Sequence, residues 1–404
     1  MPRLAEAHLN STPKILCLTA HDLDGPDYGA ALRSRHLFQL LARHGEVRVV
    51  LAGENKFSTA GKKSIGGFEL ARTIQFQPAP PRSLAGRLRN EFDPRWTDTH
   101  PFVASAADRE WLAAELPQHD LVWIYSLPLA NAFGRWRWPR SVLDIDDIPS
   151  SYYGSLLSRA NTVKEKLRWR RQIFQWRRRE KVLAERFNAI SVCSEPDRKF
   201  LGGTENLFTI PNGFVAPEKN PERRLASPPR LGFVGKLDYE PNHEGVHWFV
   251  KNVWPLILEK IPAATLRLAG TGTDKENWPT QKNIEPLGFV ADGAGEMATW
   301  SLSIVPVLTG GGTRVKIAEA FSRKCPVVAT PLGAYGYEVA DGCELFLAAT
   351  PETFANRCLQ ILNDPALGGT LAETAWQKFL RHWTWEAQAG RVAAAVNHAQ
   401  RASK

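Results

Sequence analysis

The sequence lacks any apolar run long enough to cross a membrane as a helix. Its first residues, MPRLAEAHLNSTPK, lack the apolar core of a secretory signal peptide. The five cysteines are odd in number and scattered, and Cys17, Cys193 and Cys325 lie in or beside apolar runs. We therefore expect buried thiols in a reducing cytosol, and a cytoplasmic protein.

Several catalytic and repeat signatures are also missing. The chain has no GxSxG nucleophile elbow, no P-loop lysine, no low-complexity tract and no short repeat. What remains is a chain of 404 residues, 43% hydrophobic and 23% charged, which is enough for two soluble globular domains. The formal net charge of +9 suits an anionic partner, and a nucleotide substrate, a membrane surface and nucleic acid all meet that description.

Both halves of the chain alternate short apolar runs with helical patterns, which predicts parallel α/β sheets with helices on their faces. A proline-rich, charged segment, VAPEKNPERRLASPPR (215–230), separates the two halves. We predict a disordered N-terminus over residues 1–12, a first domain over 13–214, a linker over 215–230 and a second domain over 231–383. Single helices are expected over about 161–187 and 242–260, and Pro149 is expected to end regular structure.

The stretch SIVPVLTGGGTRVKIAEAFSRKCPVVAT (303–330) has the pattern strand, glycine loop, helix, strand. Its loop leads into a helix start, whose free N–H groups and dipole suit a phosphate. Arg314 and Lys316 add positive charge there, and Glu319, further along the helix, can accept hydrogen bonds from two neighbouring ribose hydroxyls. The alternative is an ordinary crossover turn with a solvated glutamate.

Three further glycine-bearing turns follow predicted strands of the second half. They are Gly235-Lys236, Gly270 to Gly272 and Gly288-Phe289. Ligands of open α/β sheets bind beyond the carboxyl ends of the strands. We therefore expect these turns and the glycine loop to line one site, in which the backbone approaches the ligand closely.

The segment His243-Glu244-Gly245-Val246-His247 has the zinc pattern HExxH. A zinc site needs both imidazoles on one helical face, a third ligand and a cleft. Pro241-Asn242 marks a helix start, so His243 falls near the first turn; Gly245 weakens the helix, and no third ligand is evident. We therefore predict a chance match and no metal site.

A cationic segment with interleaved aromatic residues, KEKLRWRRQIFQWRRREKVLAER, occupies residues 164–186. One apolar stripe runs along it at helical spacing. Its members are Trp169, Ile173, Trp176, Leu183 and Phe187. Three interpretations remain: the stripe packs on the sheet with its arginines solvated, residues 164–187 lie on an anionic membrane surface, or the helix binds nucleic acid. No nucleic-acid module accompanies the segment, and we predict no nucleic-acid partner.

Three carboxylates, Asp144, Asp146 and Asp147, crowd the end of a predicted strand of the first half. His21 follows the first strand and faces the same edge. Caps and turn residues are one interpretation of such acids, and an acceptor-side or metal site is the other. His21, Asp146 and Asp147 are the predicted acceptor-side residues.

Motifs in both halves occur in a recognisable order. They are GAALRSRHLFQLLARHGEV, VLDIDD, ISVCSEPD and IPNG in the first half, and FVGKLDYEPN, LRLAGTG, EPLGFVAD and the glycine stretch followed by TPLG in the second. Together they resemble the marks of glycosyltransferase family 4. The resemblance implies the GT-B fold, in which two Rossmann-like doubly wound domains face each other across a cleft for a nucleotide sugar.

The resemblance also implies roles for individual residues. Glu319 would hold the donor ribose, and Phe289 and Val290 would meet the base. Lys236, Arg314 and Glu319 would be catalytic. The implied donor-binding set is Gly29, Gly235, Lys236, Gly270, Phe289, Val290, Gly311, Gly312, Thr313, Arg314, Lys316 and Glu319. Residues 384–404 would form a helix that crosses back to the first domain.

The implied activity is a metal-independent, retaining glycosyl transfer without a cofactor. A nucleotide-diphosphate sugar would be the co-substrate, and the acceptor a sugar, a lipid-linked glycan or another glycan. Bacterial polysaccharide, glycolipid or glycoconjugate synthesis would be the setting, with the enzyme cytoplasmic or peripheral on the inner face of the membrane. A GT-B epimerase or phosphorylase-like enzyme and a non-catalytic nucleotide-sugar-binding or scaffold protein are the alternatives.

Two departures from the family pattern bear on the site. The family carries two glutamates eight positions apart, and Glu319 matches the second while Gly311 stands where the first belongs. The family's lysine shortly after Gly235-Lys236 is also absent, with Glu244-Gly245 near its place. The second departure raises the question of whether Lys316 replaces the missing cation.

Overall fold

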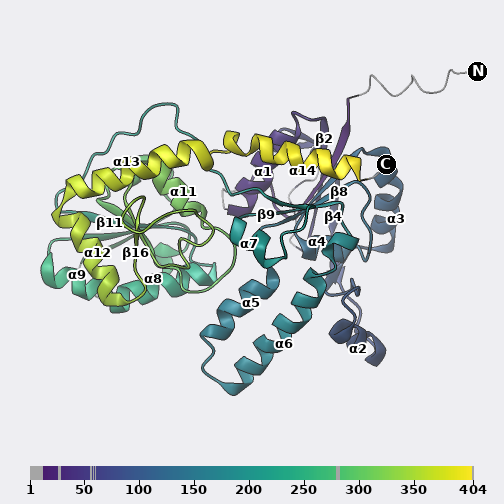
Figure 1. Ribbon diagram of the computed structural model, residues 1–404, viewed down its shortest axis with the longest axis horizontal. Helices are drawn as coiled ribbons and strands as arrows, with labels where there is room; N and C mark the ends of the chain where they lie inside the picture. Colours follow the sequence, from purple (N-terminus) through teal and green to yellow (C-terminus); the bar gives the residue numbers. More distant parts are fainter. Residues whose placement is uncertain are drawn as a thin grey trace, which may run out of the picture. The chain divides into compact units, whose positions relative to one another are not determined.

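The computed structural model describes residues 12–25, 29–54, 57, 59, 61–278 and 283–402 (Figure 1). The predicted disordered N-terminus lies outside these residues except for its last position. The chain divides into two compact units. The first comprises Met1–Ser150, Thr162–Ile210 and Ala389–Lys404, and the second Ser151–Asn161 and Pro211–Gln388.

The first unit is built on an eight-stranded sheet in the order β10-β9-β8-β7-β1-β2-β4-β3. Its strands are β1 Lys14–Thr19, β2 Glu46–Gly53, β3 Ser64–Ile65, β4 Phe68–Gln75, β7 Leu121–Tyr125, β8 Ser141–Ile145, β9 Ala189–Val192 and β10 Leu207–Thr209. All neighbours pair in parallel except β3 and β4. A separate antiparallel pair joins β5 (Gln77–Pro78) to β6 (Phe102–Val103). Near-continuous apolar runs form the central strands, as expected for strands buried on both faces.

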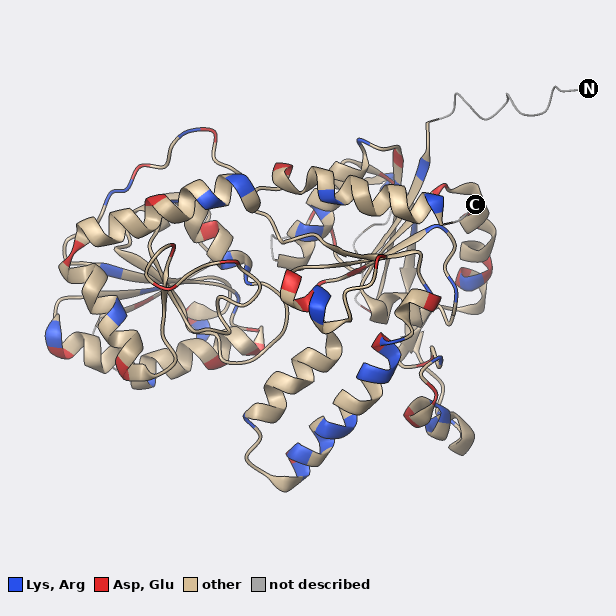
Figure 2. Cartoon of the chain, in the orientation of Figure 1, with Lys and Arg blue, Asp and Glu red and all other residues tan. Residues whose placement is uncertain are grey.

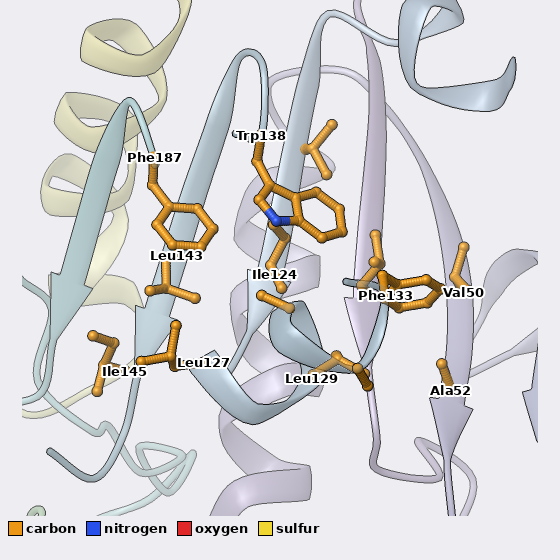
Figure 3. Close-up of a cluster of buried hydrophobic side chains, with 14 of the residues drawn as sticks. Val50, Ala52, Ile124, Leu127, Leu129, Phe133, Trp138, Leu143, Ile145 and Phe187 are labelled. Carbon is orange, nitrogen blue, oxygen red and sulfur yellow. The ribbon is translucent and has the colours of Figure 1, made fainter. Parts of the chain in front are cut away.

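Helices flank this sheet, and all of those described except α2 bury at least one residue. They are α1 Gly29–Leu41, α2 Leu84–Phe92, α3 Ala106–Glu115, α4 Leu127–Ala132, α5 Pro149–Ser158 (shared with the second unit), α6 Val163–Glu180, α7 Glu195–Phe200 and α14 Ala389–Arg401. The core on one face contains Phe133, Trp138 and Phe187, with α1 and α14 behind the sheet in the same view (Figure 3). Helix α14, the predicted crossing helix, packs on β8, β9 and α1.

The second unit has a six-stranded, wholly parallel sheet in the order β13-β12-β11-β14-β15-β16. Its strands are β11 Arg230–Val234, β12 Thr265–Ala269, β13 Ile284–Gly288, β14 Leu302–Val305, β15 Val327–Ala329 and β16 Phe346–Leu347. Its helices are α8 Glu240–Asn252, α9 Trp254–Lys260, α10 Gly293–Ala298, α11 Val315–Ser322, α12 Pro351–Asn363 and α13 Pro365–His382. The apolar faces of α8, α9 and α12 share one core cluster, and those of α11 and α13 share another. The doubly wound organisation predicted for both halves is thus confirmed within each unit.

Three helix predictions were wrong in detail. The helix expected over 242–260 breaks at Val253, because Pro255 has no N–H to give and its ring clashes with the preceding turn. The helix expected over 161–187 ends at Glu180, after which a tight turn buries Leu183 and Phe187 in the sheet core. Pro149 begins α5 instead of ending regular structure, because the first helical turn tolerates proline.

The segment predicted as a linker, 215–230, contains no helix or strand until β11 begins at Arg230. Most of it is exposed, but Arg223 donates from Nη1 to the carbonyl of Met297 over 2.8 Å and from Nη2 to that of Trp300. These bonds tie it to the second unit, to which the whole segment belongs.

The cysteines are free thiols, and Cys17, Cys193 and Cys325 are fully buried as expected. Within the described ranges, no helix combines the length and the apolarity that crossing a membrane requires.

Candidate functional site

The glycine loop of the second unit connects β14 to α11 and is held from several sides. The N–H of Gly310 donates to Ser155 Oγ over 3.0 Å, and Asn212 Nδ2 donates to Thr313 Oγ1 over 2.9 Å. Because α11 begins at Val315, the N–H groups of its first turn form the positive end of its dipole. That of Ile317 donates to the carbonyl of Arg314 over 2.9 Å. The predicted phosphate-binding geometry of strand, glycine loop and helix start is therefore present.

Arg314, at the N-cap of α11, is 6% exposed and turns its guanidinium into the loop. Its Nη1 donates to the carbonyls of Gly311 and Gly312, the second over 3.0 Å, and its own carbonyl accepts from Tyr337 Oη over 2.9 Å. Arg314 therefore shapes the loop. Its predicted contact with a pyrophosphate stays a prediction.

Lys316 joins α11 to the start of α8. Its Nζ donates to Asn242 Oδ1 over 2.6 Å and lies 4.2 Å from the centre of the Phe233 ring. Burial and, less strongly, the positive charge of Arg314 lower the pKa of Lys316 to about 7, while the negative charge of Glu319 opposes both. The ammonium is thus poised to change its charge close to neutral pH.

Glu319 lies on α11 and is partly buried. Burial raises the pKa of its carboxyl, while the positive charges of Arg323 and Lys316 lower it. Among the residues that the structure describes, none donates a hydrogen bond to this carboxylate. Its acceptor capacity therefore remains available to a ligand, as the ribose hypothesis requires.

The other predicted glycine turns lie at the carboxyl ends of neighbouring strands β11, β12 and β13. Gly270 has a φ of 130°, and a Cβ there would lie 2.1 Å from the carbonyl oxygen of Gly235, so the two turns touch at a point where only glycine fits. Phe289, next to Gly288, is 77% exposed, and Val290 beside it is partly buried. An exposed ring at this edge offers a flat surface to a base.

Asn242 is a site residue that the sequence did not single out. Besides accepting from Lys316, it donates from Nδ2 to the carbonyl of Lys236 over 2.7 Å and so links the first glycine turn to α11. Glu244 was also missed as an organising residue: it accepts from Thr309 Oγ1 over 2.7 Å and pairs with Arg159 at 2.7 Å. The sequence offered no signal for these long-range contacts beyond the helix start at Pro241.

Gly29 belongs to the first unit, where it is the first residue of α1. Its predicted approach to the donor phosphates stays a prediction.

The predicted acceptor-side residues of the first unit lie near one another at the carboxyl edge of the sheet. The ring of His21 meets that of Tyr125 edge-on at 4.7 Å, and Tyr125 Oη donates to Asp146 Oδ2 over 3.1 Å. Cys193 Sγ donates to the other carboxylate oxygen of Asp146 over 2.9 Å. Burial lowers the pKa of His21 to about 4, against the opposing charge of Asp146, so the imidazole is neutral at neutral pH. Asp147 is exposed.

Asp144 has a structural role. It is fully buried and accepts from Arg33 Nη2 over 2.6 Å, from Arg33 Nε over 2.9 Å and from Ser191 Oγ over 2.6 Å. Arg33 also donates to the carbonyl of Ile210 over 2.9 Å. This network fastens α1 to the carboxyl ends of β8 and β9.

The basic helix α6 carries two apolar stripes. The predicted one faces inward: Trp169, Ile173 and Trp176 are partly buried, and Trp176 packs against the core. A second stripe, unnoticed in the sequence, consists of Val163, Leu167 and Phe174, whose side chains are 75%, 61% and 50% exposed. The packing interpretation therefore accounts for one face of the helix only.

Comparisons with known proteins agree with this geometry. Residues 228–364 match the family model described as Glycosyl transferases group 1. Over 143 residues the chain is 27% identical to the "Uncharacterized 44.6 kDa protein in cps region" of Klebsiella pneumoniae, a match that spans 31% of this chain and only 35% of that protein.

Two solved structures share the fold over 94% of this chain. Sucrose-phosphate synthase from Thermosynechococcus elongatus superimposes with a TM-score of 0.69 at 16% identity, over 97% of its length. Anabaena Alr3699/HepE in complex with UDP and glucose superimposes with a TM-score of 0.61 at 17% identity, over 98% of its length. The chain has the GT-B fold, as its resemblance predicted. Residues 228–364 are thus similar to glycosyl transferases group 1, and the placement of the chain in family 4 stays a prediction.

Proposed function

We propose that the protein is a retaining glycosyltransferase that moves a sugar from a nucleotide diphosphate to a glycan acceptor. The observation that carries the proposal is the arrangement on α11. The positive end of a helix dipole, the ammonium of Lys316 and the accepting carboxylate of Glu319 all belong to one helix that follows a glycine loop. A diphosphate and a ribose match these three features in charge and in hydrogen-bonding capacity.

The same groups would act in the reaction. Negative charge develops on the leaving diphosphate as the glycosidic bond breaks, and fixed N–H dipoles and cations stabilise it without having to reorganise. Lys316, held by Asn242, supplies a positioned positive charge, and the guanidinium of Arg314 keeps the loop in shape. We propose that these groups carry out the stabilisation without a metal.

Two of these similar proteins support the nature of the substrates and the biological setting. The Anabaena relative has UDP and glucose bound, which supports a nucleotide-sugar donor here. The Klebsiella relative is described as encoded in a cps region, which supports a setting in bacterial polysaccharide synthesis. On the acceptor side we propose His21 and Asp146, because a neutral imidazole and a carboxylate together can orient an acceptor hydroxyl.

The test is turnover of a panel of nucleotide-diphosphate sugars by the purified chain, with glycan acceptors present and absent. Acceptor-dependent release of a nucleoside diphosphate, with an α-linked product from an α-linked donor, is the expected result. Conversion of the donor sugar without an acceptor would favour an epimerase. A requirement for free phosphate would favour a phosphorylase-like enzyme, and donor binding with no turnover would favour a scaffold.

A surface of the first unit favours a second property, peripheral binding to an anionic membrane. Helix α2 buries none of its residues, and Leu84, Leu88 and Phe92 lie along one face with exposed fractions of 75%, 54% and 57%. Glu91 joins α2 to α6 through bonds from Arg171 Nε over 2.9 Å and from Gln175 Nε2 over 2.6 Å. Two neighbouring amphipathic helices thus each leave an apolar stripe exposed.

The charge around these stripes supports a lipid leaflet as the occupant. Lysines and arginines run along most of α6 (Figure 2). Arg87 and Arg89 on α2 are exposed as well. Exposed apolar side chains amid dense positive charge match an anionic interface, into which the apolar groups insert while the cations meet headgroup phosphates. We name Leu84, Leu88, Phe92, Val163, Leu167 and Phe174 the exposed apolar set.

A further inference from the structure

The two histidines of the HExxH sequence converge on a third group that their sequence neighbourhood does not contain. His243 Nε2 lies 3.4 Å from Glu276 Oε1, and His247 Nε2 lies 3.4 Å from Glu276 Oε2. Glu276 comes from the segment after β12, directly behind the short turn Thr273–Lys275. Among the described residues, these three form the group whose ligand atoms all lie within 4.8 Å of one another.

The separations suit zinc. With Zn–N and Zn–O distances of about 2.0–2.2 Å, tetrahedral geometry places neighbouring ligand atoms about 3.3–3.5 Å apart. Both nitrogen-to-oxygen separations already have this value. The two contacts use different oxygens of Glu276, and the imidazole rings are 4.3 Å apart between centroids. With one atom taken from each residue, the ligand atoms lie within 4.8 Å of one another, so side-chain rotation would complete the tetrahedral geometry.

The surroundings hold the ligands in place and leave them reachable. Trp278 stacks on His247 at 4.8 Å, and its Nε1 donates to the carbonyl of Thr273 over 2.7 Å, so this ring supports the imidazole on one side. The three side chains are 38%, 35% and 31% exposed, in the order His243, His247, Glu276. His247 Nε2 itself is buried and, among the described residues, has no hydrogen-bond partner, so a bound cation would satisfy it.

The site differs from that of a zinc peptidase, whose central glutamate serves as the general base. Here Glu244 is already engaged, because it accepts from Thr309 Oγ1 and pairs with Arg159. Gly245, at the centre of the motif, lets α8 approach the sheet, because a Cβ there would lie 2.4 Å from the carbonyl oxygen of Pro306. Hydrolytic chemistry is thus not what this arrangement offers.

We propose that His243, His247 and Glu276 bind one zinc ion, or a cation of the same class, that fastens the segment after β12 to the first turns of α8. Two imidazoles and a carboxylate are a zinc ligand set that leaves a fourth position for water. The ion would act on stability, and it would sit next to Asn242, the residue that links the first glycine turn to Lys316. Metal binding would affect donor binding through Asn242 only if the proposed donor site is correct. Metal binding itself does not depend on the donor site.

The test uses the untagged full chain, stripped with a chelator and titrated with Zn²⁺ by calorimetry, alongside thermal unfolding. One ion per chain and a rise in Tm with added Zn²⁺ are expected, because a ligand that binds only the folded state stabilises it. The variants His247→Asn and Glu276→Gln should each weaken binding roughly tenfold or more, since even groups that only support a ligand cost that much. Co²⁺ in the same site should give the visible absorption of a four-coordinate ion.

Matched controls are His382→Asn and Glu259→Gln, which alter an exposed histidine and an exposed glutamate elsewhere in the second unit. Both should bind Zn²⁺ like the unaltered chain. Loss of binding in either control, or unaltered binding in both His247→Asn and Glu276→Gln, would overturn the site. So would the absence of any stoichiometric binding, which would leave Glu276 with only its contacts to the two histidines. Because none of these measurements uses a sugar donor, failure here leaves the proposed transferase activity standing.

Discussion

The Nζ of Lys316 donates a hydrogen bond to Asn242 Oδ1 across 2.6 Å, and this contact joins the glycine-loop helix α11 to the first turn of α8. The same asparagine donates to the carbonyl of Lys236. Two turns that lie far apart in the chain therefore depend on one amide, which also fixes the position of the Lys316 ammonium.

The charge of Lys316 should make donor binding depend on pH. Burial lowers the pKa of Lys316 to about 7 in the free chain, and a bound diphosphate should raise it again. Binding then takes up a proton at pH values between these two pKa values, so affinity for a nucleoside diphosphate should fall as the pH rises, by at most about tenfold per unit. Titrations from pH 7.5 to 9, where the phosphates keep their charge, would measure this fall.

Two variants separate Lys316 from other titrating groups. Lys316→Arg keeps its charge throughout this range, so its affinity should be nearly independent of pH. Lys316→Met should bind more weakly, also without a pH slope. The free protein gives an independent check: the unfolded chain holds the proton up to a pKa of 10.5, so stability should rise with pH above 7, and Lys316→Met should lose that rise. A flat affinity profile in the unaltered protein would contradict the role of Lys316.

The buried pair of Arg33 and Asp144 should be important for stability. Arg33→Met leaves a fully buried carboxylate without its partner, which should lower the free energy of unfolding by about 3–5 kcal/mol. Replacing both residues with apolar ones should recover much of this loss. Urea denaturation would measure both effects, with Lys62→Met as the control, because the exposed pair of Lys62 and Asp24 should contribute little to stability. Equal losses of unfolding free energy in Arg33→Met and Lys62→Met would show that the buried pair stabilises the fold no more than an exposed pair does.

The sequence predicted the alternation of strands and helices well because both sheets are parallel and buried. Their strands are short apolar runs, and each run is followed by a turn residue that marks its carboxyl end. The glycine turns at 235, 270 and 288 were found in this way, and the structure places them on neighbouring strands. The helical spacing of apolar residues predicted one helix where the structure has two. Pro255 interrupts the backbone hydrogen bonding and so divides this pattern into α8 and α9.

Contacts between distant segments could not be predicted from one sequence. Nothing near Lys316 indicates that Asn242 accepts its hydrogen bond, and nothing near His243 indicates that Glu276 lies beside it. Such pairs are set by how the strands are ordered in the sheet. Helix α2 was missed for another reason: its apolar residues bury nothing in the first unit, so it contributes to no core that a fold argument could require.

The exposed apolar set and the arginines of α6 should bind anionic vesicles. The protein should sediment with vesicles that contain phosphatidylserine, and less so as salt screens the cations. The triple variant Leu84→Ser, Leu88→Ser, Phe92→Ser should reduce binding roughly tenfold or more, because it removes apolar surface that would enter the leaflet. Its folding should be unaffected, since α2 buries none of its residues.

Charge variants on α6 should be chosen by exposure. Arg170 and Arg177 are exposed, and their replacement by Gln should weaken vesicle binding, most strongly at low salt. Arg179 is unsuitable because it is buried and donates to Asn90 Oδ1 over 3.0 Å. Leu225→Ser, an exposed apolar position of the second unit, is the matched control and should bind like the unaltered chain. If equal amounts of protein sediment with neutral and with anionic vesicles, the membrane proposal is wrong and α6 only packs on the first unit.

The carboxylate of Glu319 provides the sharpest test of the donor site. If it accepts hydrogen bonds from two ribose hydroxyls, each bond is charge-assisted and contributes roughly 1.5–3 kcal/mol. Glu319→Gln keeps the size and one acceptor oxygen but removes the charge, so affinity for a nucleoside diphosphate should fall about tenfold or more, and Glu319→Ala should lower it further. Since burial raises the pKa of this carboxyl, the folded state disfavours its charged form, and the neutral Gln should leave the Tm of the free protein unchanged or slightly higher.

Removing the ribose hydroxyls instead of the carboxylate identifies the partner. A nucleotide without both hydroxyls should bind the unaltered protein poorly, and Glu319→Gln should then cost little more, because the interaction is already lost. Glu373→Gln, which alters an exposed glutamate on α13, is the control and should leave nucleotide affinity unchanged. If the losses from the variant and from the altered nucleotide simply add, Glu319 acts somewhere other than the ribose. If Glu319→Gln binds as tightly as the unaltered protein, or unfolds the free chain, this glutamate is structural and the donor lies elsewhere.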